Sequence, residues 1–246
     1  MNKHRRAVMN LENYEQHLYD ELIKRNVTLN EIQLSQFQKY AQLLIEWNEK
    51  MNLTAIKTMP EIYSKHFLDC ILPSFSLPLE GHLCDVGAGA GFPSIPLKIV
   101  YPELKVTIVE PLQKRCVFLR HLVQELNLKD VEIKNERSED FAKVAREKFD
   151  FVSARAVANL TMLAELCIPL VKVQGTFLAM KGSSALDELE QAQYAIQVLG
   201  CKLLFSDEYE LAGAKRMNFV FSKVKSTPAK YPRMFAKIKK EPLVRK

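Results

Sequence analysis

The stretch from His82 to Phe92 reads His-Leu-Cys-Asp-Val-Gly-Ala-Gly-Ala-Gly-Phe and decides the fold. It holds three of the eight glycines of the 246-residue chain within five positions. The apolar residues before Gly87 predict a strand, and those after Phe92 predict a helix. A glycine turn between a strand and a helix is where α/β sheets bind ligands, because glycine lets the backbone approach a ligand closely. We therefore expect a ligand at this turn rather than a purely structural bend.

Short apolar runs and helical patterns alternate after this turn. The strands are predicted at His82–Val86, Val106–Glu110, Val131–Lys134, Phe149–Ser153 and Thr176–Met180. The helices between them are predicted at Ile95–Val100, Gln113–Leu126, Glu139–Arg146 and Leu160–Val171. This order predicts an α/β fold, a Rossmann-like parallel sheet with helices on both faces and right-handed crossovers. After a helix at Ser184–Leu199, two more strands at Lys202–Phe205 and Asn218–Val224 predict a seventh strand that joins antiparallel at the sheet edge.

The first 75 residues predict helices. Asn30 and Gln33 form an N-cap and N3 pair, and apolar residues then repeat every three or four positions from Phe37 to Trp47. Pro60 suits the first turn of a further helix. The domain organisation that we expect is a helical segment at 1–75 packed on the core, a Rossmann-like domain at 76–225 and a basic C-terminal tail at 226–246.

Positive charge is concentrated at the C-terminus. From Lys223 to Lys246 there are nine basic residues and only Glu241 as an acid, a net of +8 in a chain whose net charge is +6. The remaining 222 residues therefore sum to about −2. Such a segment predicts a polyanionic partner, either nucleic acid or an anionic membrane surface. Tyr231 and Phe235 could stack a base, whereas the alternative is a disordered, solubilising extension.

Composition and cysteine usage narrow the class of protein. With 48% hydrophobic and 26% charged residues, the chain is not collagen, low-complexity disorder or a small disulfide scaffold. Its five cysteines are an odd number at wide spacings, without a Cys-x-x-Cys pair or a metal-binding His cluster. The basic start, Met1–Arg6, is not followed by an apolar core, and no run reaches the ~18 apolar residues of a membrane span. We expect a soluble cytoplasmic protein with no metal and no membrane partner.

The identity of the ligand depends on residues around the glycines. Dinucleotide folds carry Gly-x-Gly-x-x-Gly, whereas here the pattern is Asp-x-Gly-x-Gly-x-Gly, beginning at Asp85. A carboxylate there suits a cationic ligand better than a pyrophosphate. Glu110 ends the next predicted strand, 19 residues after Gly91, where a carboxylate can bind ribose hydroxyls. The spacing alone leaves two nucleoside cofactors open, and an NAD-linked oxidoreductase is one alternative.

The loop is similar to motif I of S-adenosylmethionine-dependent methyltransferases. Flanking segments resemble one family among them, the RsmG (glucose-inhibited division protein B) methyltransferases of bacterial small-subunit ribosomal RNA. The matching segments are Trp47–Thr54, Lys65–Asp69, Asp85–Leu97, Lys114–Arg115 with Phe118–Leu119, Arg137–Glu139, Ser153 with Arg155–Ala156, and Lys181–Gly182. Three positions depart from the family pattern: Cys70 replaces a usual Ser, Ala88 a frequent small hydroxyl residue, and Ser94 a usual Gly. These departures are small.

The resemblance implies a substrate, a cofactor and site residues. The implied activity is methylation of N7 of a specific guanine in the 530 loop of 16S ribosomal RNA, within an assembling small-subunit particle, with S-adenosylmethionine as the methyl donor. The resemblance carries over Gly87, Phe92, Ser138, Glu139 and Arg155 as cofactor-binding residues. The glycine pattern and the strand ends add Gly89 and Glu110 to that set.

Guanine N7 has an in-plane lone pair and no proton to lose, so its methylation needs no general base. Positioning should dominate the catalysis. The positioning candidates are Arg155 and Lys181. For Arg155 we favour contact with a phosphate or the cofactor over a structural ion pair. Lys181 could reach RNA or be a solvated surface lysine.

Other readings of the same residues stay open. Lys65, His66 and Asp69 lie within one helical turn and could close over the site, and His66 is equally a structural histidine. Ser138 could cap the next helix instead of binding the cofactor. A non-enzymatic RNA-binding module would also account for the basic tail and the N-terminal helices.

Overall fold

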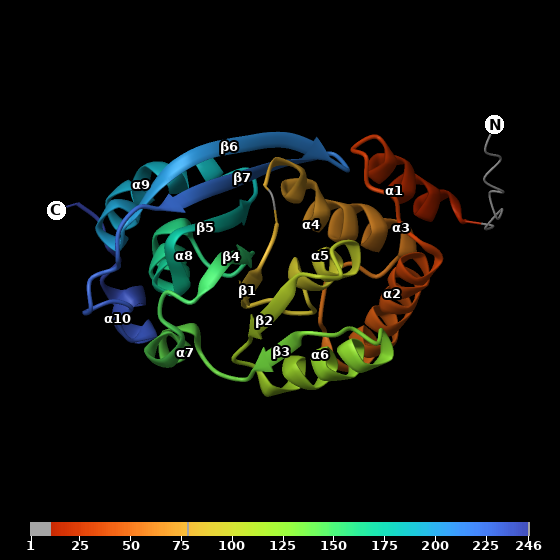
Figure 1. Ribbon diagram of the computed structural model, residues 1–246, viewed down its shortest axis with the longest axis horizontal. Coiled ribbons are helices and arrows are strands. Elements are labelled where there is room, and N and C mark those ends of the chain that lie inside the picture. Colours follow the sequence, from red (N-terminus) through yellow and green to blue (C-terminus); the bar gives the residue numbers. More distant parts are fainter. Residues whose placement is uncertain (1–10, 78, 246) are drawn as a thin grey trace.

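The computed structural model describes residues 11–77 and 79–245 of the chain, so Met1–Arg6 and Lys246 lie outside the described residues. Its centre is a seven-stranded sheet in the order β3-β2-β1-β4-β5-β7-β6 (Figure 1). The strands are β1 (His82–Val86), β2 (Lys105–Val109), β3 (Val131–Lys134), β4 (Phe149–Arg155), β5 (Val171–Lys181), β6 (Cys201–Leu211) and β7 (Ala214–Lys223). The first five are parallel, which confirms the predicted α/β Rossmann-like fold.

The antiparallel strand is not at the edge, so that part of the prediction is wrong. β7 lies between β5 and β6 and runs antiparallel to both, and β6 forms the edge. β6 and β7 form a hairpin joined by Ala212 and Gly213, and both strands are longer than predicted. The second half of β6 was not predicted because residues Ser206 to Glu210 are mostly polar. An edge strand can be polar where its side chains face water.

Helices cover both faces of the sheet. They are α5 (Ser94–Val100) and α6 (Gln113–Glu125) on one face, and α7 (Ser138–Ala145), α8 (Leu160–Cys167) and α9 (Ala185–Leu199) on the other. The helix predicted at Leu160–Val171 is too long. It passes into a 3₁₀ turn, η3 (Ile168–Leu170), and Val171 already begins β5. Pro169 is the physical reason, because proline lacks the N–H that would continue the helix.

The N-terminal helices pack on the α5–α6 face. They comprise α1 (Asn13–Ile23), α2 (Glu31–Met51), α3 (Met59–Glu61), the π-helical η1 (Ile62–Leu68), α4 (Asp69–Ile71) and the 3₁₀ turn η2 (Leu72–Ser76). The predicted capping box of α2 is present: Asn30 Oδ1 accepts from Gln33 N, and Gln33 Oε1 accepts from Asn30 N, each at 2.9 Å. Pro60 lies in α3, as expected for a first turn. None of the described helices is long and apolar enough to cross a membrane.

The C-terminal segment, residues 224–245, packs on the opposite face, and its helix α10 (Phe235–Lys240) lies beside α7 in Figure 1. Tyr231 is only 7% exposed and, with Ile238, belongs to the core of that face. The expectation that Tyr231 stacks a base is therefore wrong, because its ring is buried. The alternative of a disordered extension is also wrong for the described part of the segment, because Thr227, Tyr231 and Ile238 are buried and Arg233 is bonded to the buried Glu165.

Candidate functional site

The turn after β1 is held at both of its ends by one carboxylate. Asp85, fully buried, accepts a hydrogen bond from Ser94 N at 3.0 Å through Oδ2 and one from Ser153 Oγ at 3.3 Å through Oδ1. Burial raises the pKa of Asp85 to about 7, although these hydrogen bonds oppose the shift. Asp85 therefore fixes the start of α5 against β4, and it does not expose its charge to a ligand as the sequence suggested.

Two glycines give this turn its shape. Gly87 has φ +72°, and a Cβ there would lie 2.8 Å from Cγ2 of Val157 in the loop after β4. Gly89 has φ +61°, and no atom lies within 4 Å of the place that its Cβ would take. A side chain at Gly87 would collide with the β4 loop, whereas the space beside Gly89 is open. This opening leaves the backbone of the turn accessible to a ligand.

Glu110 comes directly after β2 and reaches this turn. Its Oε2 accepts from Gly89 N at 3.1 Å, and its Oε1 accepts from Leu112 N at 3.0 Å. Each oxygen keeps a second lone pair, so the carboxylate can still accept hydrogen bonds from hydroxyl groups. The structure therefore brings the predicted acid and the glycine turn together.

Ser138 and Glu139 form the first turn of α7, at the same edge of the sheet. Glu139 is 3% exposed, and its Oε1 is a buried oxygen without a hydrogen-bond partner among the described residues. Ser138 does not cap the helix, because Arg137 occupies the N-cap position and Ser138 Oγ donates to Leu166 O at 2.6 Å. An unpaired buried carboxylate oxygen is costly, so it indicates a donor that a ligand would supply.

Phe92 closes the turn against the N-terminal helices. Its ring stacks on His66 with centroids 4.2 Å apart and faces Tyr40 at 5.6 Å. Tyr40 Oη donates to Ala90 O at 2.7 Å, inside the turn itself. From the sequence, Tyr40 is only one member of the apolar repeat that runs from Phe37 to Trp47. Helix periodicity cannot show that a tyrosine hydroxyl reaches a loop 50 residues away.

Arg155, at the end of β4, is the centre of a network with the N-terminal helices. Its guanidinium lies 3.0 Å from Asp69 Oδ2, donates to Lys65 O at 2.8 Å, and stands over the Phe92 ring at 5.6 Å. The structural ion pair that we weighed against a ligand contact is therefore present. Asp69, 2% exposed, also lies 3.0 Å from Arg216 Nε.

His66 lies in the same network. Its Nε2 is 2.8 Å from Thr54 Oγ1, and its Nδ1 is 3.3 Å from a terminal nitrogen of Arg155. Burial, with the neighbouring charge of Arg155, lowers the pKa of His66 to about 3. The imidazole is therefore neutral at physiological pH and is engaged through both nitrogens.

A cavity of about 250 Å³ opens beside Arg155, at the carboxyl ends of β4 and β5. Its polar lining is Asp69, Arg155, Lys181, Glu188, Arg216 and Asn218. The β6–β7 hairpin supplies the last two residues, which sequence reasoning missed. The only signal for them was the antiparallel strand, whose register pairs Met217 with Lys181 and so brings Arg216 to this edge.

Lys181 is neither free nor solvated. Its side chain is 9% exposed, and its Nζ lies 2.6 Å from Glu188 Oε2 and donates to Ala158 O at 2.8 Å. Glu188 in turn accepts from Leu160 N at 2.8 Å. Lys181 therefore fastens the loop after β4 to α9.

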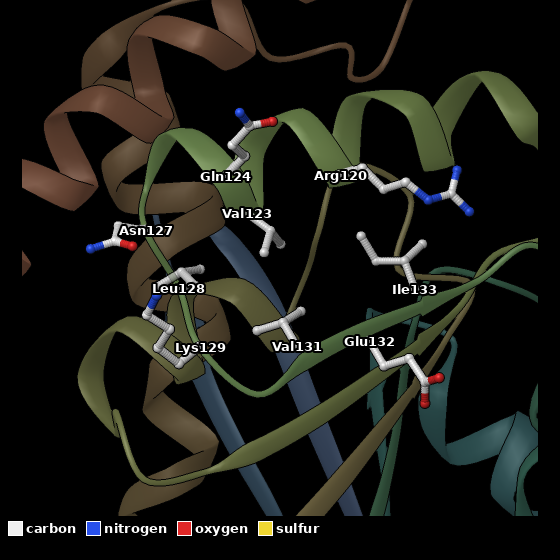
Figure 2. Close-up of a pocket in the computed structure, with 9 residues that line it drawn as sticks. All are labelled: Arg120, Val123, Gln124, Asn127, Leu128, Lys129, Val131, Glu132 and Ile133. Atoms are coloured by element: carbon white, nitrogen blue, oxygen red, sulfur yellow. The ribbon is translucent and has the colours of Figure 1, made fainter.

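A larger cavity, of about 500 Å³, lies between α6 and β3 (Figure 2). Val123, Val131 and Ile133 line its apolar part, and Arg120 and Lys129 stand at its sides. None of the predicted site residues lines it. The cavity beside Arg155 is therefore the better candidate for substrate, although it is smaller.

The residues around the turn fit S-adenosylmethionine. The open space beside Gly89 can take a ligand against the backbone, and Glu110 offers acceptor oxygens for ribose hydroxyls. The unpaired Oε1 of Glu139 can accept from an exocyclic amine of a purine.

Comparison with known proteins decides the family. A family model described as GidB, rRNA small subunit methyltransferase G, matches residues 33–217. The chain belongs to the rRNA small subunit methyltransferase G family. Two relatives named "Ribosomal RNA small subunit methyltransferase G", from Staphylococcus aureus strains Newman and bovine RF122, are 51% and 52% identical to it over 235 residues. Each alignment covers 93% of this chain and 98% of the relative, so the resemblance expected from the sequence is confirmed.

Solved structures agree with the fold of this methyltransferase G family member. The crystal structure of M. jannaschii TYW2 in complex with AdoMet has a TM-score of 0.50 at 14% identity, covering 63% of this chain and 77% of that one. The YcgJ protein of Bacillus subtilis has a TM-score of 0.51 at 13% identity, covering 65% of this chain and 100% of that one. At such low identity these likenesses show the fold alone.

Proposed function

We propose that this protein transfers a methyl group from S-adenosylmethionine to N7 of a specific guanine in the 530 loop of 16S ribosomal RNA. The observation that carries the proposal is the cavity beside Arg155, at the carboxyl ends of β4 and β5, whose two carboxylates are both held in ion pairs, Asp69 with Arg155 and Glu188 with Lys181, so that neither is a free base. N7 of guanine needs no such group. S-adenosylmethionine supplies an electrophilic methyl carbon when it is bound.

The nearest candidate base is occupied. His66 is neutral, but its two ring nitrogens face Thr54 and Arg155, and its ring is stacked on Phe92. Amino and ring-carbon acceptors lose a proton when they are methylated, whereas N7 does not. A site without a free base therefore favours N7 over those acceptors.

The nearest cysteine argues against carbon-5 chemistry. That reaction uses a cysteine thiolate as a nucleophile, and Cys70 is the thiol that contacts Arg155, at 3.1 Å. Burial raises the pKa of Cys70 to about 12, although Arg155 opposes the shift. The group stays a thiol at physiological pH, so it is a poor nucleophile.

In the proposed mechanism the chain binds and orients both reactants. Gly89, Glu110 and Glu139 would hold the cofactor through its ribose and adenine, while Gly87 and Phe92 shape the turn around it. Arg155 would fix η1 and α4 beside the site through Lys65 and Asp69, and Lys181 would fix the loop after β4 through Ala158. Holding the two reactants in line can contribute several kcal/mol to the rate.

Neither an NAD-linked oxidoreductase nor a non-enzymatic RNA-binding module agrees with membership of a methyltransferase family. The substrate that we propose is small-subunit ribosomal RNA within an assembling particle, in the cytoplasm. Methyl transfer to mature small subunits and to assembly intermediates can be compared directly. Greater transfer to mature subunits than to assembly intermediates would contradict this part of the proposal.

The test is transfer of a labelled methyl group to ribosomal RNA, followed by mapping of the modified base. We expect Gly87→Asp to abolish transfer and S-adenosylmethionine binding, because its side chain would meet Val157 and place a charge in the turn. Gly213→Asp is the matched control, since Gly213 also has a positive φ but lies in the hairpin turn with open space around it. Label on a pyrimidine, on an exocyclic amine, or equal loss in both variants would overturn the proposal.

A further inference from the structure

The C-terminal segment presents an unusual set of free cations. Its exposed basic residues are Lys225, Lys230, Lys237, Lys239, Lys240 and Arg245, and Glu241 is its only acid. Within the part of the chain that the structure describes, none of these six side chains forms an ion pair. Unpaired lysines and arginines on one segment give a positive surface that attracts a polyanion.

The segment is fixed to the protein by two other cations that face inward. Lys223 is fully buried, with its Nζ 2.9 Å from Glu147 Oε1 and 2.8 Å from Thr227 Oγ1. Arg233 holds the buried carboxylate of Glu165 through two hydrogen bonds of 2.7 and 2.8 Å. The six exposed cations therefore lie on a segment that is already ordered, so RNA binding does not include the entropic cost of ordering the chain.

Carbonyl groups of the segment are bonded as well. Arg146, which follows α7, donates to the backbone oxygens of Thr227, Pro228 and Tyr231. These bonds fix the path of the chain from the end of β7 along α7. The segment is therefore a part of the folded enzyme, with its charges at defined places.

The basic surface reaches the catalytic edge of the sheet. The guanidinium of Arg137 lies 5.2 Å from the centroid of the Phe235 ring, at the start of α10. Arg137 is exposed and lies two residues before Glu139, which is one of the proposed cofactor residues. A polyanion lying on α10 can therefore continue past Arg137 to the site.

We infer that the segment 224–245 is a second RNA-binding surface, which holds the sugar-phosphate backbone of small-subunit ribosomal RNA outside the reacting loop. The inference rests on the proposed function, because it takes ribosomal RNA as the substrate. A bilayer is the weaker alternative: α10 turns Ile238 inward and exposes Lys237, Lys239 and Lys240, so it lacks the apolar face that inserts into lipid.

The experiment compares two charge-matched variants. One is Lys237→Gln/Lys239→Gln/Lys240→Gln, which removes three exposed cations of α10 and keeps the Arg233 and Lys223 anchors. The control is Lys24→Gln/Lys105→Gln/Lys129→Gln, which removes three exposed lysines away from the segment. Binding to unmethylated 16S ribosomal RNA, free and within small subunits, is measured between 50 and 200 mM salt, with thermal unfolding as a check on folding.

We expect the α10 variant to reduce the slope of log affinity against log salt by about 2 to 3, because each lost phosphate contact removes about 0.7 to 0.9. Its affinity for S-adenosylmethionine and its kcat at saturating RNA should be unchanged, while its KM for RNA rises. The control variant should leave the slope unaltered.

Three outcomes would overturn the inference: an unchanged slope, an equal loss in the control, or loss of binding to anionic phospholipid vesicles while RNA binding persists. These results are separable from failure of the proposed function. Normal methyl transfer by a variant with an unchanged slope would refute only the second surface. A wild-type protein that binds RNA through α10 but transfers no methyl group would refute only the proposed activity.

Discussion

The N-terminal helices and the C-terminal segment cover opposite faces of one sheet by different chemistry. The helices use an aromatic cluster in which the rings of Phe37 and Tyr40 each lie 5.0 Å from Phe67. The C-terminal segment uses ionic contacts: Lys223, the last residue of β7, bonds both Glu147 and Thr227, and Arg233 pairs with the buried Glu165. Both regions cover the sheet, but they contribute differently to function. The N-terminal helices form a wall of the candidate site, whereas the C-terminal segment leaves free cations on the surface.

The largest effect should come from breaking an ionic anchor. Arg233→Ala leaves the Glu165 carboxylate buried without its partner, so we expect the free energy of unfolding to fall by about 3 to 5 kcal/mol. Urea unfolding measures this, and limited proteolysis should show cleavage near residue 233. The control is Lys143→Ala, which breaks the exposed pair with Asp140 and should cost under about 1 kcal/mol. Equal losses in the two variants would show that the ionic anchor is dispensable.

A smaller effect should follow from loss of one hydroxyl in the aromatic cluster. Tyr40→Phe removes the donor to Ala90 O in the glycine turn, and we expect a loss of about 1 to 3 kcal/mol in stability together with weaker S-adenosylmethionine binding. Tyr63→Phe is the control, because its hydroxyl bonds Glu15 in the same cluster, away from the turn. If calorimetry shows equal cofactor affinity in the two variants, the N-terminal helices do not shape the site.

The smallest effect concerns pH and should appear in one region only. Burial tends to raise the pKa of Glu147, but hydrogen bonds from Lys223 and Thr227 outweigh it and lower the pKa below its usual 4.5. A lowered carboxyl pKa stabilises the fold above pH 4.5, and this contribution is lost as pH falls through the lowered value. Below pH 4.5, hydrogen exchange corrected for intrinsic rates should therefore rise in residues 224–245 before it rises in α2. Simultaneous loss of protection would contradict the ionic account.

The structure also changes how the basic segment can be studied. Deleting everything after Ser226 would remove most of the exposed cations of the segment. It would also remove Thr227, Tyr231 and Arg233, which are bonded to or buried in the core. A truncated protein would therefore lose stability, so single-site changes of exposed lysines are the better test.

Local patterns predicted most of the fold. The five parallel strands and the capping box of α2 follow from apolar periodicity and from neighbouring residues. The hairpin did not follow, because β7 enters between β5 and β6 through pairings with β5 residues that are 36 to 46 positions away in the sequence. The early end of α8 could have been predicted, since Pro169 was visible in the sequence.

The candidate site was predictable to the extent that it lies at strand ends. Glu110 and Gly89 meet as expected, because neighbouring parallel strands end at the same edge. The contacts of Arg155 with Asp69 and of Asp69 with Arg216 were not predictable, since they join three distant segments. The neutral state of His66 also depends on burial that no local pattern reveals.

The stack of Tyr40, Phe92 and His66 sets how much of this enzyme must be transferred for the glycine turn to keep its contacts. A protein engineer who transplanted the sheet and its glycine turn from η2 onward would leave behind Tyr40 and His66, two of the three rings. The graft would then expose Phe92 to water and lose the hydroxyl that grips the turn. A domain exchange between enzymes of this kind should therefore begin upstream of α2, so that the N-terminal helices and the glycine turn are transferred together.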